Sequence, residues 1–163
     1  MRDETVALRV ELEALYRERY REFVRVATAI VGNESSGIDV VQESFARSLA
    51  ALASFRGQGS PAGWVWRILV NTARTQARRI EVPVERLEPS TNGASAAAGE
   101  GADVQRWLVL LPERQRLVVF LRYYADLDYR SIAEALEVEV GTVSATLNAA
   151  HDRLRRLMEE VPQ

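Results

Sequence analysis

Residues 111–156 read LPERQRLVVFLRYYADLDYRSIAEALEVEVGTVSATLNAAHDRLRR, and this stretch decides the fold of the C-terminal half of the chain. Between residues 129 and 147 the apolar side chains fall where two short helices joined by a tight turn would bury one shared face. Asp128 is placed to cap the first helix, and Gly141-Thr142 marks the start of the second. The pattern predicts a helix-turn-helix, whose second helix lies in the major groove in DNA-binding proteins. A helical hairpin that only packs fits the same pattern.

The composition excludes several classes of protein. The 163 residues allow one ordinary domain or two small ones. The chain has no cysteine and a single histidine, His151, so we expect no disulfide, no metal site and no cofactor. No nucleophile or acid–base pair stands out, which argues against an enzyme. No apolar run reaches membrane-spanning length and no signal sequence opens the chain, so we expect a soluble, cytoplasmic protein without membrane insertion.

The arginines are distributed unevenly along the chain. The net charge is −2, which taken alone argues against nucleic acid as a partner. Between Glu43 and Glu81, however, there is no acidic residue. The arginines of this acid-free block are Arg47, Arg56, Arg67, Arg74, Arg78 and Arg79. Such a one-sided block is the electrostatic pattern typical of a nucleic-acid-binding surface.

Helical periodicity predicts three helices in the N-terminal half, over residues 5–31, 38–54 and 62–79. In the third, side chains at spacings of three and four share one face: Trp64, Arg67, Asn71, Arg74 and Arg78. Guanidiniums bind phosphates, an aromatic ring stacks on bases and an amide bonds to base edges, so this face suits single-stranded nucleic acid. Taken alone, the helix favours a plainer arrangement, with Trp64 buried and the arginines solvated. Trp66 lies off this face and is expected in the core.

Residues 81–103 separate the two halves. They include Pro83, Pro89 and a run of small residues without a bulky apolar side chain, which predicts a flexible acidic linker. The predicted fold class is therefore all-α, with two small helical domains over residues 5–80 and 104–160, the second ending in the helix-turn-helix. In the free protein the halves are either held apart by the linker or packed together, which would hide both DNA-binding faces.

Several short motifs also follow one another in a recognisable order. They are Asp39-Val40-Val41-Gln42-Glu43-Ser44-Phe45, Phe55-Arg56-Gly57, Trp64 with Arg67-Ile68 and Asn71-Thr72-Ala73, Leu111-Pro112-Glu113-Arg114-Gln115-Arg116, Leu121-Arg122-Tyr123-Tyr124, Tyr129, Ile132-Ala133-Glu134 and Val140-Gly141-Thr142-Val143. Each motif is weak alone. Their order, over nearly all of the chain outside the linker, resembles that of the extracytoplasmic-function (ECF) sigma factors of bacterial RNA polymerase.

The resemblance implies three binding surfaces and their partners. The clamp helices of the largest polymerase subunit would bind Asp39, Gln42 and Glu43. The minus-ten promoter element would be melted, and a flipped base held, by Phe55, Arg56, Trp64, Arg67, Asn71, Arg74 and Arg78. The minus-35 element would be read by Arg130, Thr142, Ser144, Ala145, Thr146, Asn148 and Arg153, in a domain that also meets the beta flap of the polymerase. An anti-sigma factor is a further implied partner.

The chain departs from the family pattern at two places. The recognition helix usually carries basic residues after Gly-Thr-Val, but here it has few cations, so we expect weak binding or a readout with few phosphate contacts. The turn before it commonly has glycine, where this chain has Glu137; a left-handed backbone there would cost on the order of 1 kcal/mol. Two alternatives stay open: a stand-alone helix-turn-helix regulator, and an interaction protein derived from a sigma factor.

Overall fold

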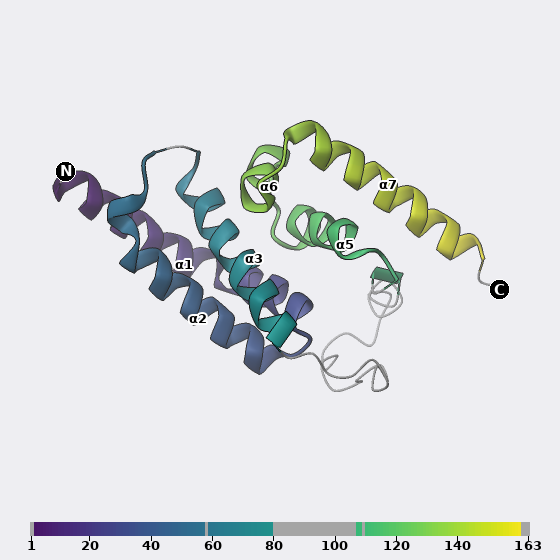
Figure 1. Ribbon diagram of the computed structural model, residues 1–163, viewed down its shortest axis with the longest axis horizontal. Helices are drawn as coiled ribbons and strands as arrows, with labels where there is room; N and C mark the ends of the chain where they lie inside the picture. Colours follow the sequence, from purple (N-terminus) through teal and green to yellow (C-terminus); the bar gives the residue numbers. More distant parts are fainter. Residues whose placement is uncertain (1, 58, 80–106, 109, 161–163) are drawn as a thin grey trace.

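The computed structural model describes residues 2–57, 59–79, 107–108 and 110–160, and this part of the chain contains helices and no strand (Figure 1). The N-terminal helices are α1 (Arg2–Val31), α2 (Glu34–Ala50), the 3-10 turn η1 (Leu52–Ser54) and α3 (Pro61–Arg79). The C-terminal ones are α5 (Glu113–Val119), the π-helical turn η4 (Phe120–Tyr124), α6 (Tyr129–Leu136) and α7 (Val140–Glu159). The predicted all-α fold with two helical domains is confirmed. The predicted linker, residues 81–103, lies outside the described residues.

Aromatic rings hold α1, α2 and α3 together as a three-helix bundle. Phe23 of α1 lies between Phe45 of α2 and Trp66 of α3, with ring centroids 5.1 and 4.3 Å away. Phe23 and Trp66 are fully buried and Phe45 nearly so, which confirms that Trp66 belongs to the core. Large buried rings contribute more apolar area than any other side chain, so this cluster fixes where α3 lies on the bundle.

The second helix differs from its prediction at both ends. It begins at Glu34 and not at residue 38, because the side chain of Asn33 caps it by accepting a hydrogen bond from the Ser36 amide at 2.8 Å. It ends at Ala50, and the residues up to Ser54 form a separate 3-10 turn. Gly37 lets α2 approach α1 closely: a Cβ at this position would lie 2.9 Å from the backbone nitrogen of Thr28.

The helix-turn-helix is present at the predicted place. Asp128 caps α6, because its Oδ1 accepts a hydrogen bond from the Ser131 amide at 2.7 Å, and this bond lowers the pKa of the carboxyl group. Helix α6 ends at Leu136, and its C-cap residue Glu137 has a left-handed backbone with φ +55°. Helix α7 begins at Val140, one residue before the predicted start. The two helices share a buried face, which includes Ile132, Ala133, Val143, Leu147 and Ala150.

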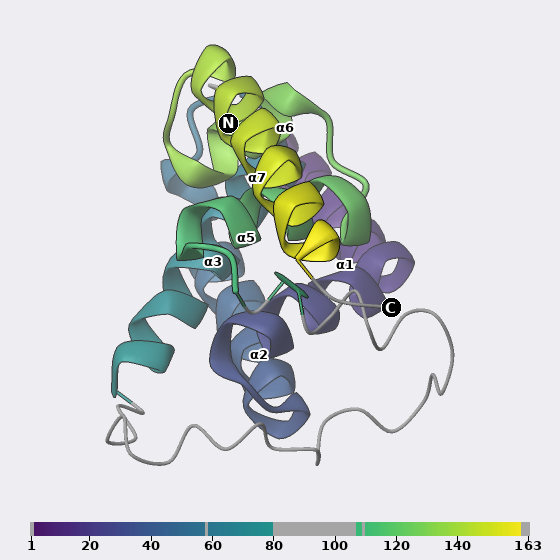
Figure 2. The same ribbon diagram turned by 90° about the vertical axis from the view of Figure 1, so that its right-hand side faces the viewer.

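The two halves pack against each other. Helix α6 lies on α3, and η4 contacts α1. The buried side chains form one cluster that continues from the N-terminal bundle into the C-terminal helices. In Figure 1 the N-terminal bundle occupies one side of the molecule and α5 to α7 the other, and Figure 2 shows α7 on the outside of the C-terminal half. Of the two arrangements expected for the free protein, the structure has the packed one.

Candidate nucleic-acid interface

The predicted nucleic-acid face of α3 begins at an aromatic pair. Phe55, in the loop before the helix, packs against Trp64 with ring centroids 5.1 Å apart. Trp64 is half-buried and packs on the core, whereas Trp66 is fully buried. Both arrangements that the sequence allowed for Trp64 are thus partly realised: the ring packs on the core and stays partly exposed to solvent.

A groove lies beside this pair. It has a volume of about 1030 Å³ and runs between the first turns of α1 and the loop that leads into α3. Its apolar lining includes Leu8, Leu52, Phe55 and Pro61. Three charged residues line it as well: the exposed Arg56 on the loop, and Glu4 and Glu11 on α1. The part of the groove formed by Phe55 and Arg56 offers the surroundings that an unstacked base with its phosphate requires, whereas the two carboxylates on the α1 side would repel a phosphate.

Further along α3 the polar side chains are unequally exposed. Asn71 and Arg78 are exposed to solvent. The side chains of Arg67 and Arg74 keep 41% and 36% of their accessible surface, because residues of the C-terminal half stand beside them. Nη1 of Arg67 lies 3.7 Å from Oε1 of Glu137. Nε of Arg74 lies 2.9 Å from Oε1 of Glu113. The acid-free block in the sequence is therefore not free of carboxylates in space, and the expectation of a purely cationic surface is wrong for the packed form.

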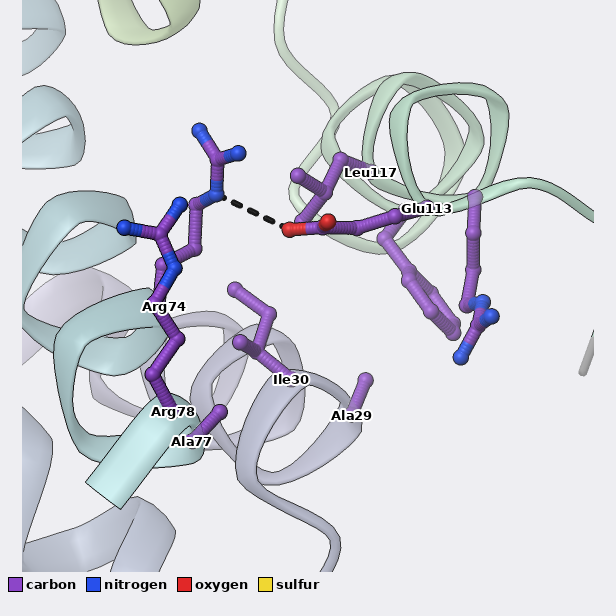
Figure 3. Close-up of a pocket in the computed structure, with 9 residues that line it drawn as sticks. Ala29, Ile30, Arg74, Ala77, Arg78, Glu113 and Leu117 are labelled. Carbon is purple, nitrogen blue, oxygen red and sulfur yellow. Dashed lines mark hydrogen bonds and ion pairs between the residues drawn. The ribbon is translucent and has the colours of Figure 1, made fainter. Parts of the chain in front are cut away.

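Both residues of the second ion pair line a small cavity between the halves. The cavity measures about 280 Å³ and is lined by α1, α3 and α5. Figure 3 shows Arg74 of α3 bonded to Glu113 of α5, with Ile30 of α1 and Leu117 of α5 among the other residues that line the cavity. The cavity between the halves is thus lined by apolar side chains together with charged ones, which include Arg78 and Arg116 as well as the ion pair.

A third carboxylate reaches the start of α3. Oε2 of Glu134 accepts hydrogen bonds from the backbone amide and the hydroxyl of Ser60, both at 3.1 Å. Sequence reasoning missed Ser60, Gly63 and Glu134. The only signal for them was the segment Ser60-Pro61-Ala62-Gly63, which has the N-cap serine of a capping box but glycine where such a box has glutamate or glutamine.

The predicted docking residues lie together on α2. Asp39, Gln42 and Glu43 are all exposed, at spacings that place them on one side of the helix. Glu43 forms an ion pair with Arg47 one turn further on. The face that α2 turns toward the bundle contains Val40, Val41 and other buried residues. The structure thus brings the three predicted residues to one accessible surface.

The recognition helix α7 is not hidden by the packing of the halves. Its outer residues Gly141, Ala145, Asn148 and Ala149 are exposed, while Thr142, Ser144 and Thr146 are half-buried. Arg130 at the start of α6 and Arg153 on α7 are exposed as well. The expectation that packing hides both DNA-binding faces is wrong, because α7 stays exposed and the α3 face is covered only in part, at Arg67 and Arg74. The exposed side of α7 has no cationic residue before Arg153, as the sequence indicated.

Comparison with known proteins assigns both halves. Residues 15–81 match the sigma-70 region 2 family, and residues 102–154 match the sigma-70 region 4 family. The ECF RNA polymerase sigma-E factor of Salmonella typhimurium is 33% identical over 134 residues, covering 71% of this chain and 70% of the relative. The chain belongs to the ECF sigma factors. It is thus a transcription initiation factor. The region 2 match covers α1 from residue 15 onward together with α2 and α3, and the region 4 match covers α5, α6 and α7 up to residue 154.

Two solved structures show the same fold. One is CnrH in complex with the cytosolic domain of CnrY, with a TM-score of 0.74 and 21% identity over 98% of this chain and 95% of that one. The other is the sigma factor RpoE of Bartonella quintana in complex with the anti-sigma factor NepR, with a TM-score of 0.64 and 20% identity over 99% and 100%. Within the described residues of the present sigma factor, no helix is long and apolar enough to cross a membrane.

Proposed function

We propose that this sigma factor opens promoters with the α3 face of region 2. The observation that carries the proposal is one row of side chains on α3, preceded by the Phe55 ring, which packs tilted against Trp64. The row consists of Trp64, Arg67, Asn71, Arg74 and Arg78. The guanidiniums are suited to the phosphates of the non-template strand of the minus-ten element. The exposed amide of Asn71 is suited to a base edge.

The groove between α1 and the loop before α3 is the proposed place for an unpaired base. Extruding a base from a duplex costs a few kcal/mol. Stacking on an aromatic side chain returns about 1–3 kcal/mol per base, and contacts of Arg56 and Arg67 with neighbouring phosphates add to this. The mechanism is capture of a separated strand, with no covalent step.

We further propose that α2 docks on core RNA polymerase. Asp39, Gln42 and Glu43 form an exposed polar surface with two carboxylates, which suits a basic partner such as the clamp helices of the largest subunit. This function places the chain with the polymerase in the cytoplasm.

Region 4 is the proposed reader of the minus-35 element and the proposed contact with the beta flap. The exposed residues of α7 offer an amide and small side chains, its half-buried residues Thr142, Ser144 and Thr146 offer hydroxyls, and Arg130 and Arg153 are exposed cations of the same domain. Direct readout by Ser144, Thr146 and Asn148 with few phosphate contacts is consistent with this surface. An anti-sigma factor is a further proposed partner, since the similar sigma factor of Bartonella quintana is in complex with one.

The test is transcription in a purified system. Core RNA polymerase with this sigma factor on a genomic fragment library identifies a promoter, and the double variant Arg67→Ala with Asn71→Ala is then compared with the wild type on it. We expect the variant to retain polymerase binding but to lose strand opening, measured by permanganate reactivity of unpaired thymines. The control Arg9→Ala removes an exposed arginine of α1 whose only described partner is Glu13. Unchanged opening by the double variant would contradict the proposal.

One observation favours a second candidate function. Because the exposed side of α7 lacks cations before Arg153, an interaction protein derived from a sigma factor would present the same helix. Run-off transcription separates the two candidates, since an interaction protein would bind core polymerase without initiating.

A further inference from the structure

The N-terminus of α3 is capped by two parts of the chain. Ser60 is the N-cap, and its hydroxyl oxygen accepts a hydrogen bond from the Gly63 amide at 2.9 Å. In a capping box the third helical residue is glutamate or glutamine, and its side chain returns to the amide of the N-cap residue. Here that amide is bonded by Glu134 of α6, which lies 74 positions away in the sequence.

Gly63 makes room for this distant carboxylate. A Cβ on Gly63 would lie 2.0 Å from Oε2 of Glu134, and 3.1 Å from Cβ of the same residue. The backbone of Gly63 is not in the left-handed region, so any residue could adopt its conformation. Alanine would even favour the helix by about 1 kcal/mol. We therefore attribute the glycine at position 63 to the space that Glu134 of region 4 needs, and not to a requirement of α3 itself.

The same surface of region 4 supplies two more carboxylates to the α3 face. Glu137 stands 3.7 Å from Arg67, and Glu113 stands 2.9 Å from Arg74. Together with Glu134, they contact α3 from the N-cap residue Ser60 to Arg74 near its middle. The partners of these carboxylates belong to region 2. Arg67 and Arg74 are residues that the proposed function assigns to binding the strand of the minus-ten element, and Ser60 lies before them at the start of α3.

We infer that region 4 is an intramolecular competitor of promoter DNA: its carboxylates Glu113, Glu134 and Glu137 occupy the α3 face, and the strand of the minus-ten element binds only after they have left. This inference rests on the proposed function of that face. The α2 surface and the outer side of α7 stay exposed in the packed form, so the competition acts on strand capture and leaves the docking surface accessible.

The absence of cysteine allows a direct measurement on the full chain. Cysteines introduced at the exposed positions Ala46 of α2 and Asp152 of α7 take a donor and an acceptor dye, and single-molecule energy transfer reports the packed and the separated states. Gly63→Ala and Glu134→Ala each disrupt the split cap from one side. Their matched controls are Gly141→Ala, where a Cβ meets nothing within 4 Å, and Glu139→Ala, whose side chain makes no capping bond.

We expect the wild type to show high energy transfer, both test variants to shift to low transfer, and both controls to resemble the wild type. A fluorescent pool of single-stranded DNA of random sequence serves as the binding probe. If the packed state outnumbers the separated one by about ten to one, unmasking raises the apparent affinity about tenfold. Glu134→Ala keeps the test valid should Gly63→Ala fail to fold.

The outcomes separate the inference from the function on which it rests. Low transfer together with tighter DNA binding, lost again on adding Arg67→Ala, supports both. High transfer in both test variants overturns the inference and leaves the proposed function standing. Low transfer without tighter DNA binding overturns the assignment of the α3 face to the separated strand, and the competition falls with it.

Discussion

Glu137 offers a prediction in which removing an ion pair leaves the protein at least as stable. The residue ends α6 with φ +55° and ψ +47°, a conformation that costs residues other than glycine roughly 1–2 kcal/mol. Glu137→Gly and Glu137→Ala both delete the carboxylate that faces Arg67. Only the glycine variant also removes the backbone strain.

The two contributions can be estimated separately. The Arg67–Glu137 pair spans 3.7 Å between side chains that are 41% and 62% exposed, and such pairs contribute about 0–1 kcal/mol. Glu137→Ala should therefore lower the free energy of unfolding by no more than about 1 kcal/mol. Glu137→Gly should exceed the alanine variant by about 1 kcal/mol, and so equal or exceed the wild type.

Urea unfolding of the full chain, followed by tryptophan fluorescence, measures both differences. With urea m-values of about 1–3 kcal/mol per molar, 1 kcal/mol moves the midpoint by roughly 0.3–1 M. Equal midpoints for the glycine and alanine variants would refute the strain at this turn. A glycine variant less stable than the wild type by more than about 1 kcal/mol would show that the ion pair is stronger than an exposed pair should be.

Three further predictions concern the fold and the region 4 surface. Asp128→Ala should cost about 1 kcal/mol of stability at neutral pH through the lost cap of α6. The cap lowers the pKa of Asp128 in the folded protein. Its contribution to stability is therefore complete above the unfolded pKa of about 3.9 and is lost as the pH falls through the folded pKa. The urea midpoints of the wild type and of Asp128→Ala should accordingly converge in acid. Trp66→Ala should cost about 3–5 kcal/mol, since the ring is fully buried against Phe23, whereas Arg9→Ala should change the urea midpoint little. Arg153→Ala should reduce the slope of log affinity against log salt by about 0.9 for promoter duplex bound to the polymerase holoenzyme, if Arg153 contacts one phosphate; an unchanged slope would remove it from the minus-35 surface.

The helices and their faces were predictable because they depend on near neighbours in the sequence. The burial of Trp66 followed from its position relative to Trp64, and the cap at Asp128 followed from its place before an apolar helical pattern. The end of α2 was harder to predict, since Leu52 continues the apolar periodicity while the backbone has already turned into a 3-10 helix.

The approach of region 4 to α3 was beyond local reasoning. Charge counted along the chain describes neighbours in sequence, whereas Arg74 meets Glu113 from 39 positions away and Ser60 meets Glu134 from 74. Glu137 was singled out as a strained turn residue, but nothing in the sequence connected it to Arg67. Tertiary packing brings these groups together, and a single sequence does not specify which surfaces of two domains will meet.

The identity of the residue at the turn after α6 also has a consequence for how such a protein evolves. Every glutamate codon becomes a glycine codon through one substitution at its middle base. Position 137 therefore stands a single mutational step from glycine, and that step would relieve backbone strain while loosening the hold on Arg67. Selection could thus adjust the restraint on strand capture in either direction through this codon, without rebuilding the surface that meets DNA.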